Sequence, residues 1–209
     1  HTIGRRQRQM CIRDSIGPDG NRAIAISGVS SDHNTYYVGA ASGGLFKTTN
    51  KGISWEPIFD DQDVSSVSAI AISQKNPNIV WAGTGETFLI RPAHAIGDGI
   101  YKSEDGGNTW KNMGLQKTAR IAKIVIHPKN DKIVYVAALG HTFGPQEDRG
   151  IYKTTNGGKT WKKILFIDQN TGGIDIALDR KNPNFLIASM WEIYINTWGL
   201  NSGGESGGV

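Results

Sequence analysis

Cysteine is nearly absent from this chain of 209 residues, which contains a single one, Cys11. One cysteine cannot form an intramolecular disulfide, so the fold depends on packing and hydrogen bonds, and the thiol content does not indicate a cellular compartment. Long apolar runs are also missing. The longest, such as 121–126, have the length of a strand, far short of the ~18 residues of a membrane span. The sequence therefore predicts no membrane insertion.

An excess of charge is missing from most of the chain as well, although the formal net charge is +4. Residues 1–15 hold four arginines against one aspartate, and the remainder, with 19 basic and 18 acidic residues, carries only +1. This near-neutral remainder argues against a nucleic-acid partner. The head 1–15 lacks the apolar core of ~7–15 residues that a signal peptide needs. We interpret the head as a non-native, unstructured scar and expect the fold to begin at residue 16.

Signatures of cofactor and metal sites are incomplete. Gly83-Thr84-Gly85 lacks the third glycine and the following helix of a dinucleotide loop. Residues 60–63 resemble a calcium loop, but Ser65 stands where that loop requires glycine. His94 and His141 have no cysteine or third histidine to complete a zinc set. We therefore expect neither a cofactor nor a metal ion.

Helical periodicity is equally scarce. No window keeps apolar spacing at 3.6 residues for more than about two turns, and the 27 glycines interrupt every candidate. The sequence therefore favours β-strands over helices.

What the chain has in quantity is one motif in three copies. It reads Gly-Ile-Tyr-Lys-Ser-Glu-Asp-Gly-Gly-Asn-Thr-Trp at 99–110, returns at 150–161, and has a looser copy at 44–55. The tryptophans that end the copies lie 55 and 51 residues apart, a period typical of repeat architectures and propeller blades.

Each copy predicts a stapled β-hairpin. Its first half alternates sides like a half-buried strand. The Asp or Asn then accepts backbone N–H bonds in a tight turn while glycines adopt positive φ. The tryptophan supplies a large apolar contact between neighbouring units. The residues expected to hold the hairpins are Asn50, Gly52, Trp55, Asp105, Gly107, Trp110, Asn156, Gly158 and Trp161.

A second repeated element precedes each hairpin and consists of a strand, a Pro/Asn turn and a further strand rich in β-branched and aromatic residues. Four strands per unit, repeated radially, make a β-propeller blade. We therefore predict an all-β fold, a β-propeller of four-stranded antiparallel blades. It is expected as an incomplete fragment of about 3.5 blades, to be completed by the remaining blades of a longer chain, because whole propellers need at least ~4. The expected blades span 22–58, 67–112, 121–164 and, in part, 174–209.

The hairpin resembles the Asp-box, or BNR repeat, of sialidases, xyloglucanase-type glycosidases and sortilin. Residues 16–209 as a whole resemble the first blades of secreted bacterial Asp-box propellers that are named BNR-repeat glycosyl hydrolases. Only the middle copy carries Asp, at Asp105, while Asn50 and Asn156 keep the acceptor oxygen without the charge. The resemblance implies an extracellular or periplasmic protein in which the Asp-box residues are structural.

Function is expected on the face opposite the Asp-box turns, which carries the connections from strand two to strand three. These connections are long at 84–98 and 139–149, and in blade 4 the connection runs from Met190 toward the end. Binding residues tend to lie on loops that a rigid scaffold holds, although any one of these side chains could simply be solvated. The candidate ligand-binding residues are Glu86, Phe88, Arg91, His94, His141, Phe143, Arg149, Trp191 and Tyr194.

Three functions remain open. The preferred one is a non-enzymatic module that binds a carbohydrate, peptide or protein ligand. The second is a xyloglucanase- or sialidase-like glycoside hydrolase with catalytic carboxylates partly in the missing blades. Its two carboxylates would lie ~5–5.5 Å or ~6.5–9.5 Å apart and could include Asp98, Glu147 or Asp148. The third is an assembly scaffold, like the Asp-box propeller that assists photosystem assembly.

Neither enzyme pattern of the family transfers to this sequence. Ala41 stands where xyloglucanase-type enzymes carry an Asp, and only Arg91 and Arg149 lie in the loops where sialidases need an arginine cluster.

Overall fold

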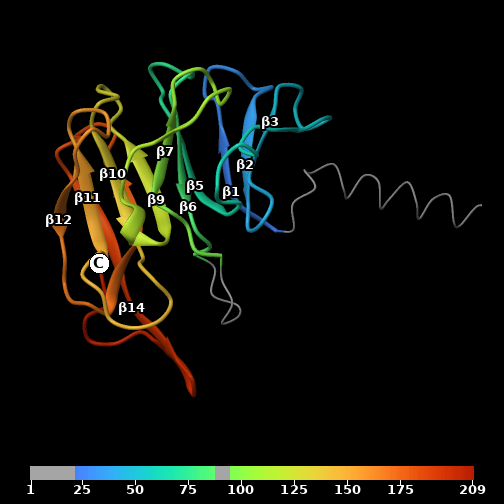
Figure 1. Cartoon of the computed structure of the whole chain (residues 1–209). Coiled ribbons are helices and arrows are strands. Elements are labelled where there is room, and N and C mark those ends of the chain that lie inside the picture. The colour runs from blue at the N-terminus through green and yellow to red at the C-terminus, as the bar shows by residue number, and fades with distance from the viewer. Residues whose placement is uncertain (1–21, 88–94) are drawn as a thin grey trace, which may run out of the picture.

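The structure is a computed structural model, and it describes residues 22–87 and 95–209. The expected scar at 1–15 and the candidates Phe88, Arg91 and His94 lie outside these residues. Figure 1 shows the described chain as a row of sheets that follow one another in sequence order. The prediction of an all-β propeller with antiparallel blades is confirmed.

Blades 1 to 3 each consist of four antiparallel strands in sequence order across the sheet. Blade 1 contains β1 (Ala23–Gly28), β2 (Tyr36–Ala40), β3 (Leu45–Thr48) and β4 (Glu56–Pro57). Blade 2 contains β5 (Val67–Ile72), β6 (Val80–Thr84), β7 (Ile100–Ser103) and β8 (Lys111–Asn112). Blade 3 contains β9 (Ile121–Ile126), β10 (Val134–Ala138), β11 (Gly150–Thr154) and β12 (Lys162–Leu165), preceded by the short 3₁₀ turn η1 (Gln116–Thr118).

The hydrophobic core lies between the blades. The first strands β1, β5, β9 and β13 (Thr171–Leu178) contact one another in that order along the inner side of the row. Strands β6 and β10 are buried at every residue, because a neighbouring blade covers each of their faces. This explains their continuous apolar sequences. Blades also approach closely enough to require glycine: a Cβ added at Gly83 would lie 2.5 Å from Cγ2 of Ile121 in the next blade.

The tryptophans of the Asp-box hairpins hold the blades together. The Trp110 Nε1 donates to the Ile58 carbonyl of blade 1 at 2.7 Å, and the Trp161 Nε1 donates to the Met113 carbonyl of blade 2 at 2.8 Å. The Trp110 ring also meets the edge of Phe59, with ring centroids 5.3 Å apart. Each indole therefore bonds to the residue that follows the last strand of the preceding blade, and the joint is built twice in the same way.

Blade 4 departs from the expectation of an open loop after Met190. Strand β14 (Leu186–Asn196) continues past this residue and returns as β15 (Gly199–Ser202), so Trp191 and Tyr194 lie in a β-hairpin and not in a loop. Alternating Ile193 and Ile195 favour an extended strand. The turn closes because the Asn196 side-chain oxygen accepts bonds from the two N–H groups of residues 198 and 199, at 2.9 and 2.8 Å.

The β14–β15 hairpin is an insertion within the blade. Strand β15 pairs only with residues 193–196 of β14. Met190, in contrast, pairs with Gly208, just as the Ala40 and Thr84 amides bond to the Gly44 and Gly99 carbonyls ahead of the third strands of blades 1 and 2. Gly208 therefore occupies the position where the third strand of a blade begins.

Candidate binding face

The propeller has two faces of different construction. The Asp-box face carries the hairpin turns 48–55, 103–110 and 154–161. The loop face carries residues 85–87 and 95–99 and the connections 139–149 and 191–207. Figure 1 shows the 139–149 connection and the β14–β15 hairpin together at the lower end of the molecule. The candidates within the described residues belong to these connections; they are Glu86, His141, Phe143, Arg149, Trp191 and Tyr194.

The Asp-box turns have one geometry in all three blades. In blade 2 the Asp105 carboxylate accepts bonds from the Thr109 N–H at 2.9 Å, the Thr109 hydroxyl at 2.6 Å and the Ser103 hydroxyl at 2.7 Å. These bonds, with the Thr109 hydroxyl first, lower the pKa of Asp105 to about 2. All polar capacity of the carboxylate is thus used inside the hairpin, and this residue has a structural environment.

In the two copies with Asn, the side chain still accepts a bond from the backbone N–H four residues later. Its bond with the hydroxyl of that residue runs in the opposite direction, from Asn Nδ2 to the hydroxyl oxygen. Asn156 accepts from the Thr160 N–H at 3.0 Å, while its own Nδ2 donates to the Thr160 hydroxyl at 2.8 Å. Asn50 makes the same pair of bonds with Ser54. The sequence analysis missed the residue two positions earlier, Thr154 in blade 3, whose hydroxyl accepts the Gly158 N–H at 3.0 Å. Its signal is a Ser or Thr at this position in every copy.

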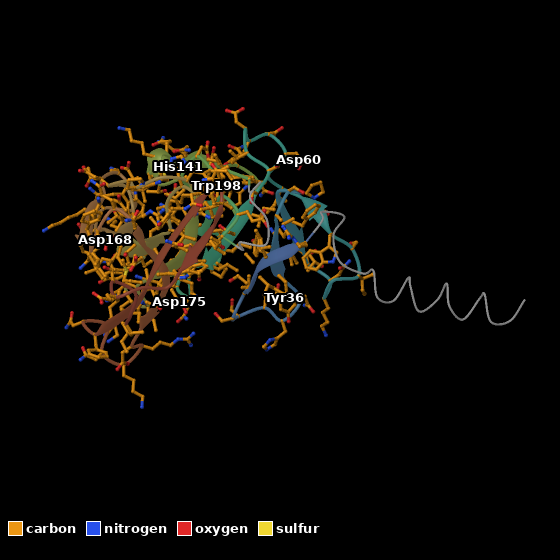
Figure 2. All side chains as sticks on the ribbon, turned by 90° about the horizontal axis from the view of Figure 1, so that it is seen from below. Tyr36, Asp60, His141, Asp168, Asp175 and Trp198 are labelled. Carbon is orange, nitrogen blue, oxygen red and sulfur yellow. The ribbon has the colours of Figure 1, made fainter. Side chains whose placement is uncertain are left out.

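Two insertions of the loop face pair with each other at its outer end, and they carry exposed apolar side chains. The Ile195 amide donates to the Thr142 carbonyl at 3.1 Å, and Phe143 forms a parallel bridge with Ile195. In Figure 2, which looks at the molecule from below, His141 and Trp198 project close to each other, and the Ile195–Thr142 bond joins the segments that carry them. The apolar rim is defined here as Phe143, Ile195, Trp198 and Leu200.

The rim is strongly exposed for an apolar surface. Trp198 at the hairpin tip is 94% exposed, Phe143 is 57% exposed and Leu200 is 50% exposed. Two further aromatic candidates lie on the hairpin beside the rim, both half-buried: Trp191, whose Nε1 donates to the Ser202 hydroxyl at 3.2 Å, and Tyr194. A contiguous exposed apolar patch on a soluble domain marks an interaction site.

The expectation that Arg149 binds a ligand requires a correction, because its side chain is buried within the protein. It is fully buried, and its guanidinium donates to the carbonyls of Asn170 at 2.7 Å, Ile193 at 2.8 Å and His141 at 3.0 Å. Burial lowers the pKa of Arg149 to about 10, opposed by the charge of Asp168. Arg149 therefore ties the 139–149 connection to the blade linker and to the β14–β15 hairpin.

Glu86 is also engaged within the protein. Its carboxylate is buried and forms an ion pair with Arg22, the residue that precedes β1. Arg120 precedes β9 in the same way, is fully buried, and its Nε donates to the Gly140 carbonyl at 2.5 Å. Burial, followed by the charge of Arg149, lowers the pKa of Arg120 to about 10. The sequence analysis missed Arg120, although an arginine immediately before a first strand recurs in blades 1 and 3.

The candidate catalytic carboxylates lie in separate environments. Asp98 accepts a bond from the Tyr101 hydroxyl at 2.6 Å, and burial together with this bond raises the pKa of Tyr101 to about 12. Glu147 is exposed and Asp148 is half-buried. Within residues 22–87 and 95–209, no hydrogen bond or ion pair joins Asp98 to either of them. The Asp98 carboxylate is thus hydrogen-bonded within blade 2.

Two further searches over the described part of the chain gave negative results. No group of three or more His, Cys, Asp or Glu side chains is arranged as a metal ion would need. No helix there has the length and apolar character required to cross a membrane.

Comparison with known proteins agrees with the geometry. Residues 98–200 match the Sortilin-Vps10 family, described as sortilin, neurotensin receptor 3. An ancestral GH74 enzyme of known structure superimposes with a TM-score of 0.66 at 25% identity, over 84% of this chain and 23% of that one. These matches support a relationship of this chain to the Asp-box β-propellers.

Two other relatives extend the comparison. The propeller is 25% identical over 153 residues to a probable oligoxyloglucan-reducing end-specific xyloglucanase of Neosartorya fischeri, which covers 70% of this chain and 16% of the relative. The structure of YCF48 bound to D1 peptide matches 90% of this chain and 52% of that one, with a TM-score of 0.54 at 15% identity, and so agrees in fold. The propeller spans only about a quarter or less of the glycosidase relatives.

Proposed function

We propose that this propeller is a carbohydrate-binding module and that the apolar rim of the loop face is its binding surface. The observation that supports the proposal most directly is the exposure of Trp198 and Phe143 on two insertions that pair with each other. Flat aromatic side chains offer a large apolar area at a low cost in conformational entropy. They suit the apolar faces of sugar rings, and hydroxyl groups around them can be met by polar side chains and water.

The surroundings of the rim support a preformed surface. Arg149 joins the 139–149 connection, the linker at Asn170 and the hairpin at Ile193 by three hydrogen bonds. A ligand that binds to rigid loops does not need to order them, which favours affinity. The likeness to GH74 structures and to a xyloglucanase supports a neutral β-glucan, such as xyloglucan, as the ligand class.

The test compares two phenylalanines of nearly equal exposure on opposite faces. Phe143 is 57% exposed on the loop face, and Phe185 is 56% exposed in the turn before β14 on the Asp-box side. We expect Phe143→Ala and Trp198→Ala each to weaken binding to xyloglucan oligosaccharides about tenfold in isothermal titration calorimetry. Phe185→Ala should leave the affinity unchanged. Equal affinities in all three variants would refute the proposal, and tighter binding of peptides than of oligosaccharides would indicate a peptide ligand.

A glycoside hydrolase is the second candidate, because the named relatives include GH74 and xyloglucanase enzymes. For this function Asp98, Glu147 or Asp148 would have to act on the bound chain. Release of reducing ends from xyloglucan, abolished in Asp148→Asn with the fold intact by circular dichroism, would favour the hydrolase. We expect no turnover by the 209-residue chain. A polysaccharide ligand also implies an extracellular or periplasmic location, which cell fractionation of the expressing organism would test.

A further inference from the structure

A second concave surface lies on the Asp-box face, between the hairpin turns of blades 2 and 3. It is a groove of about 750 Å³, within the size range of ligand sites. Four lysines line it, together with Glu104 and the edge of Trp110; the lysines are Lys102, Lys111, Lys132 and Lys159. The groove is remote from the apolar rim, which lies on the opposite face.

The preceding joint, between blades 1 and 2, shows how this position is filled elsewhere. There the Tyr37 hydroxyl and the Lys47 Nζ both donate to the Gly106 carbonyl in the next Asp-box turn, at 2.9 and 2.8 Å. Lysine and tyrosine thus bond across the joint, and the charge of this lysine is used to hold two blades together.

At the joint between blades 2 and 3, neither equivalent residue donates to the facing Asp-box turn. Trp81 takes the place of the tyrosine, and its buried Nε1 has no hydrogen-bond partner among the described residues. Lys102 takes the place of Lys47, but its Nζ lies 2.5 Å from Glu104 Oε1 instead of bonding to the facing turn. The groove opens where this cross-blade bond is absent.

The groove carries an excess of positive charge. Among the described residues that line it, Glu104 is the only acidic one, and the bond from Lys102 lowers the pKa of Glu104, which keeps this carboxylate ionised. Lys111, Lys132 and Lys159 are exposed, and none of their ammonium groups has an ion-pair or hydrogen-bond partner within residues 22–87 and 95–209. Three uncompensated cations around one concavity raise the local concentration of anions.

We propose that this groove binds a carboxylated polysaccharide chain, such as a polyuronate. A concave site between two turns fits a linear chain, and the Trp110 edge offers an apolar wall for a sugar ring. Lysine ammonium groups act as point charges that suit spaced carboxylates. The proposal is independent of the ligand at the apolar rim.

The test is binding of the 209-residue chain to oligogalacturonate, measured by isothermal titration calorimetry at low and moderate salt. We expect the double variant Lys132→Glu with Lys159→Glu to weaken binding about tenfold or more. We expect Glu104→Gln to strengthen it, because this change removes the competing carboxylate and releases Lys102. Added salt should weaken the wild-type interaction.

Matched controls separate this site from general charge and from the apolar rim. Lys75 and Lys181 are exposed lysines outside the groove, and Lys75→Glu with Lys181→Glu makes the same change in net charge. This control variant, and Phe143→Ala, should bind oligogalacturonate like the wild type. The proposal is overturned if the two double variants lose affinity equally or if Glu104→Gln has no effect. It is also overturned if polyglutamate or single-stranded DNA binds more tightly than oligogalacturonate.

Discussion

The exchange of Asp for Asn in the Asp-box turns shows how a single atom changes a local network. Asp105 can only accept hydrogen bonds while it is ionised, so the Thr109 hydroxyl must donate to it. Asn156 donates through Nδ2, so the Thr160 hydroxyl accepts. Both versions retain the bond from the backbone N–H, which explains why the two residue types interchange among the blades.

The charge of Asp105 predicts a pH-dependent contribution to stability. Its pKa falls from 3.8 to about 2 in the folded chain, with the Thr109 hydroxyl bond as the largest cause. The stabilisation is therefore complete above pH 3.8 and is lost as the pH falls towards 2. We expect Asp105→Asn to unfold at a lower temperature than the wild type at neutral pH, and the difference to shrink through this window. A difference that stays constant across the window in calorimetric melting would contradict the assignment.

Two neighbouring glycines in the blade 3 turn separate backbone strain from packing. Gly157 and Gly158 have φ of 73° and 92°, where an alanine costs about 1–2 kcal/mol. A Cβ at Gly158 would also lie 2.6 Å from the Trp81 ring, whereas at Gly157 the nearest atom is the flexible Lys102 Nζ at 3.8 Å. We expect Gly158→Ala to lose about 1–3 kcal/mol more than Gly157→Ala in urea unfolding. Equal losses would show that the indole can move aside.

At the scale of elements, the joint between blades 2 and 3 contains one hydrogen bond from an indole N–H. Trp161 donates to the Met113 carbonyl at 2.8 Å, and phenylalanine would keep most of the ring contact and remove the donor. We expect Trp161→Phe to lower the free energy of unfolding by about 1–2 kcal/mol. Trp198→Phe, at a side chain 94% exposed, should change it by less than about 0.5 kcal/mol. The measurement is urea denaturation, and a similar effect of both variants would argue against the hydrogen bond.

The elements that could be predicted from sequence are those with sister copies. The first three blades are defined by local signals, such as the glycine and tryptophan spacing, that recur in phase. The β14–β15 hairpin has no counterpart in the other blades, so its alternating Ile193 and Ile195 could not be distinguished from a loop by comparison within the chain. Arg149 was expected to be exposed because arginines in loops usually are. Its burial depends on three carbonyls that only the folded chain brings together.

The groove between the turns of blades 2 and 3 also shows a limit of prediction from sequence. Lys47 and Lys102 occupy equivalent strand positions, and sequence alone indicates the same role for both. Their bonds differ because Lys102 is followed two positions later by Glu104 and bonds to it, whereas Thr49 stands at that position after Lys47, which bonds to Gly106 of the next blade. The bond of Lys47 could not be predicted from the pattern along the chain, because Gly106 lies 59 residues away.

At the scale of the whole molecule, the outer side of blade 3 has an apolar strip without the cover seen in the other blades. The strip is Ile164 to Ile167, and its four side chains are 42%, 38%, 40% and 43% exposed. Ile164 corresponds in register to Ile58 and Met113, whose carbonyls accept the indole N–H groups. No indole N–H among the described residues bonds to the Ile164 carbonyl.

This strip predicts self-association of the 209-residue chain, because exposed apolar strips beside strand edges favour pairing. In sedimentation velocity we expect the average mass to rise with concentration in the micromolar range or above. Ile164→Ser combined with Ile167→Ser should shift the chain towards the monomer. Ile53→Ser is the control, at an isolated side chain 80% exposed in the blade 1 turn, and should have no effect. A wild type that stays monomeric would contradict the prediction.

The three bonds of Arg149 also have a kinetic consequence for the loop face. Because a single buried cation holds His141, Asn170 and Ile193, we expect these three segments to keep their relative positions. A ligand then meets a face that is ready at each encounter, so its association rate is set by diffusion and orientation. Loss of this one guanidinium would let the segments move separately, and would slow capture before it altered any contact with the ligand.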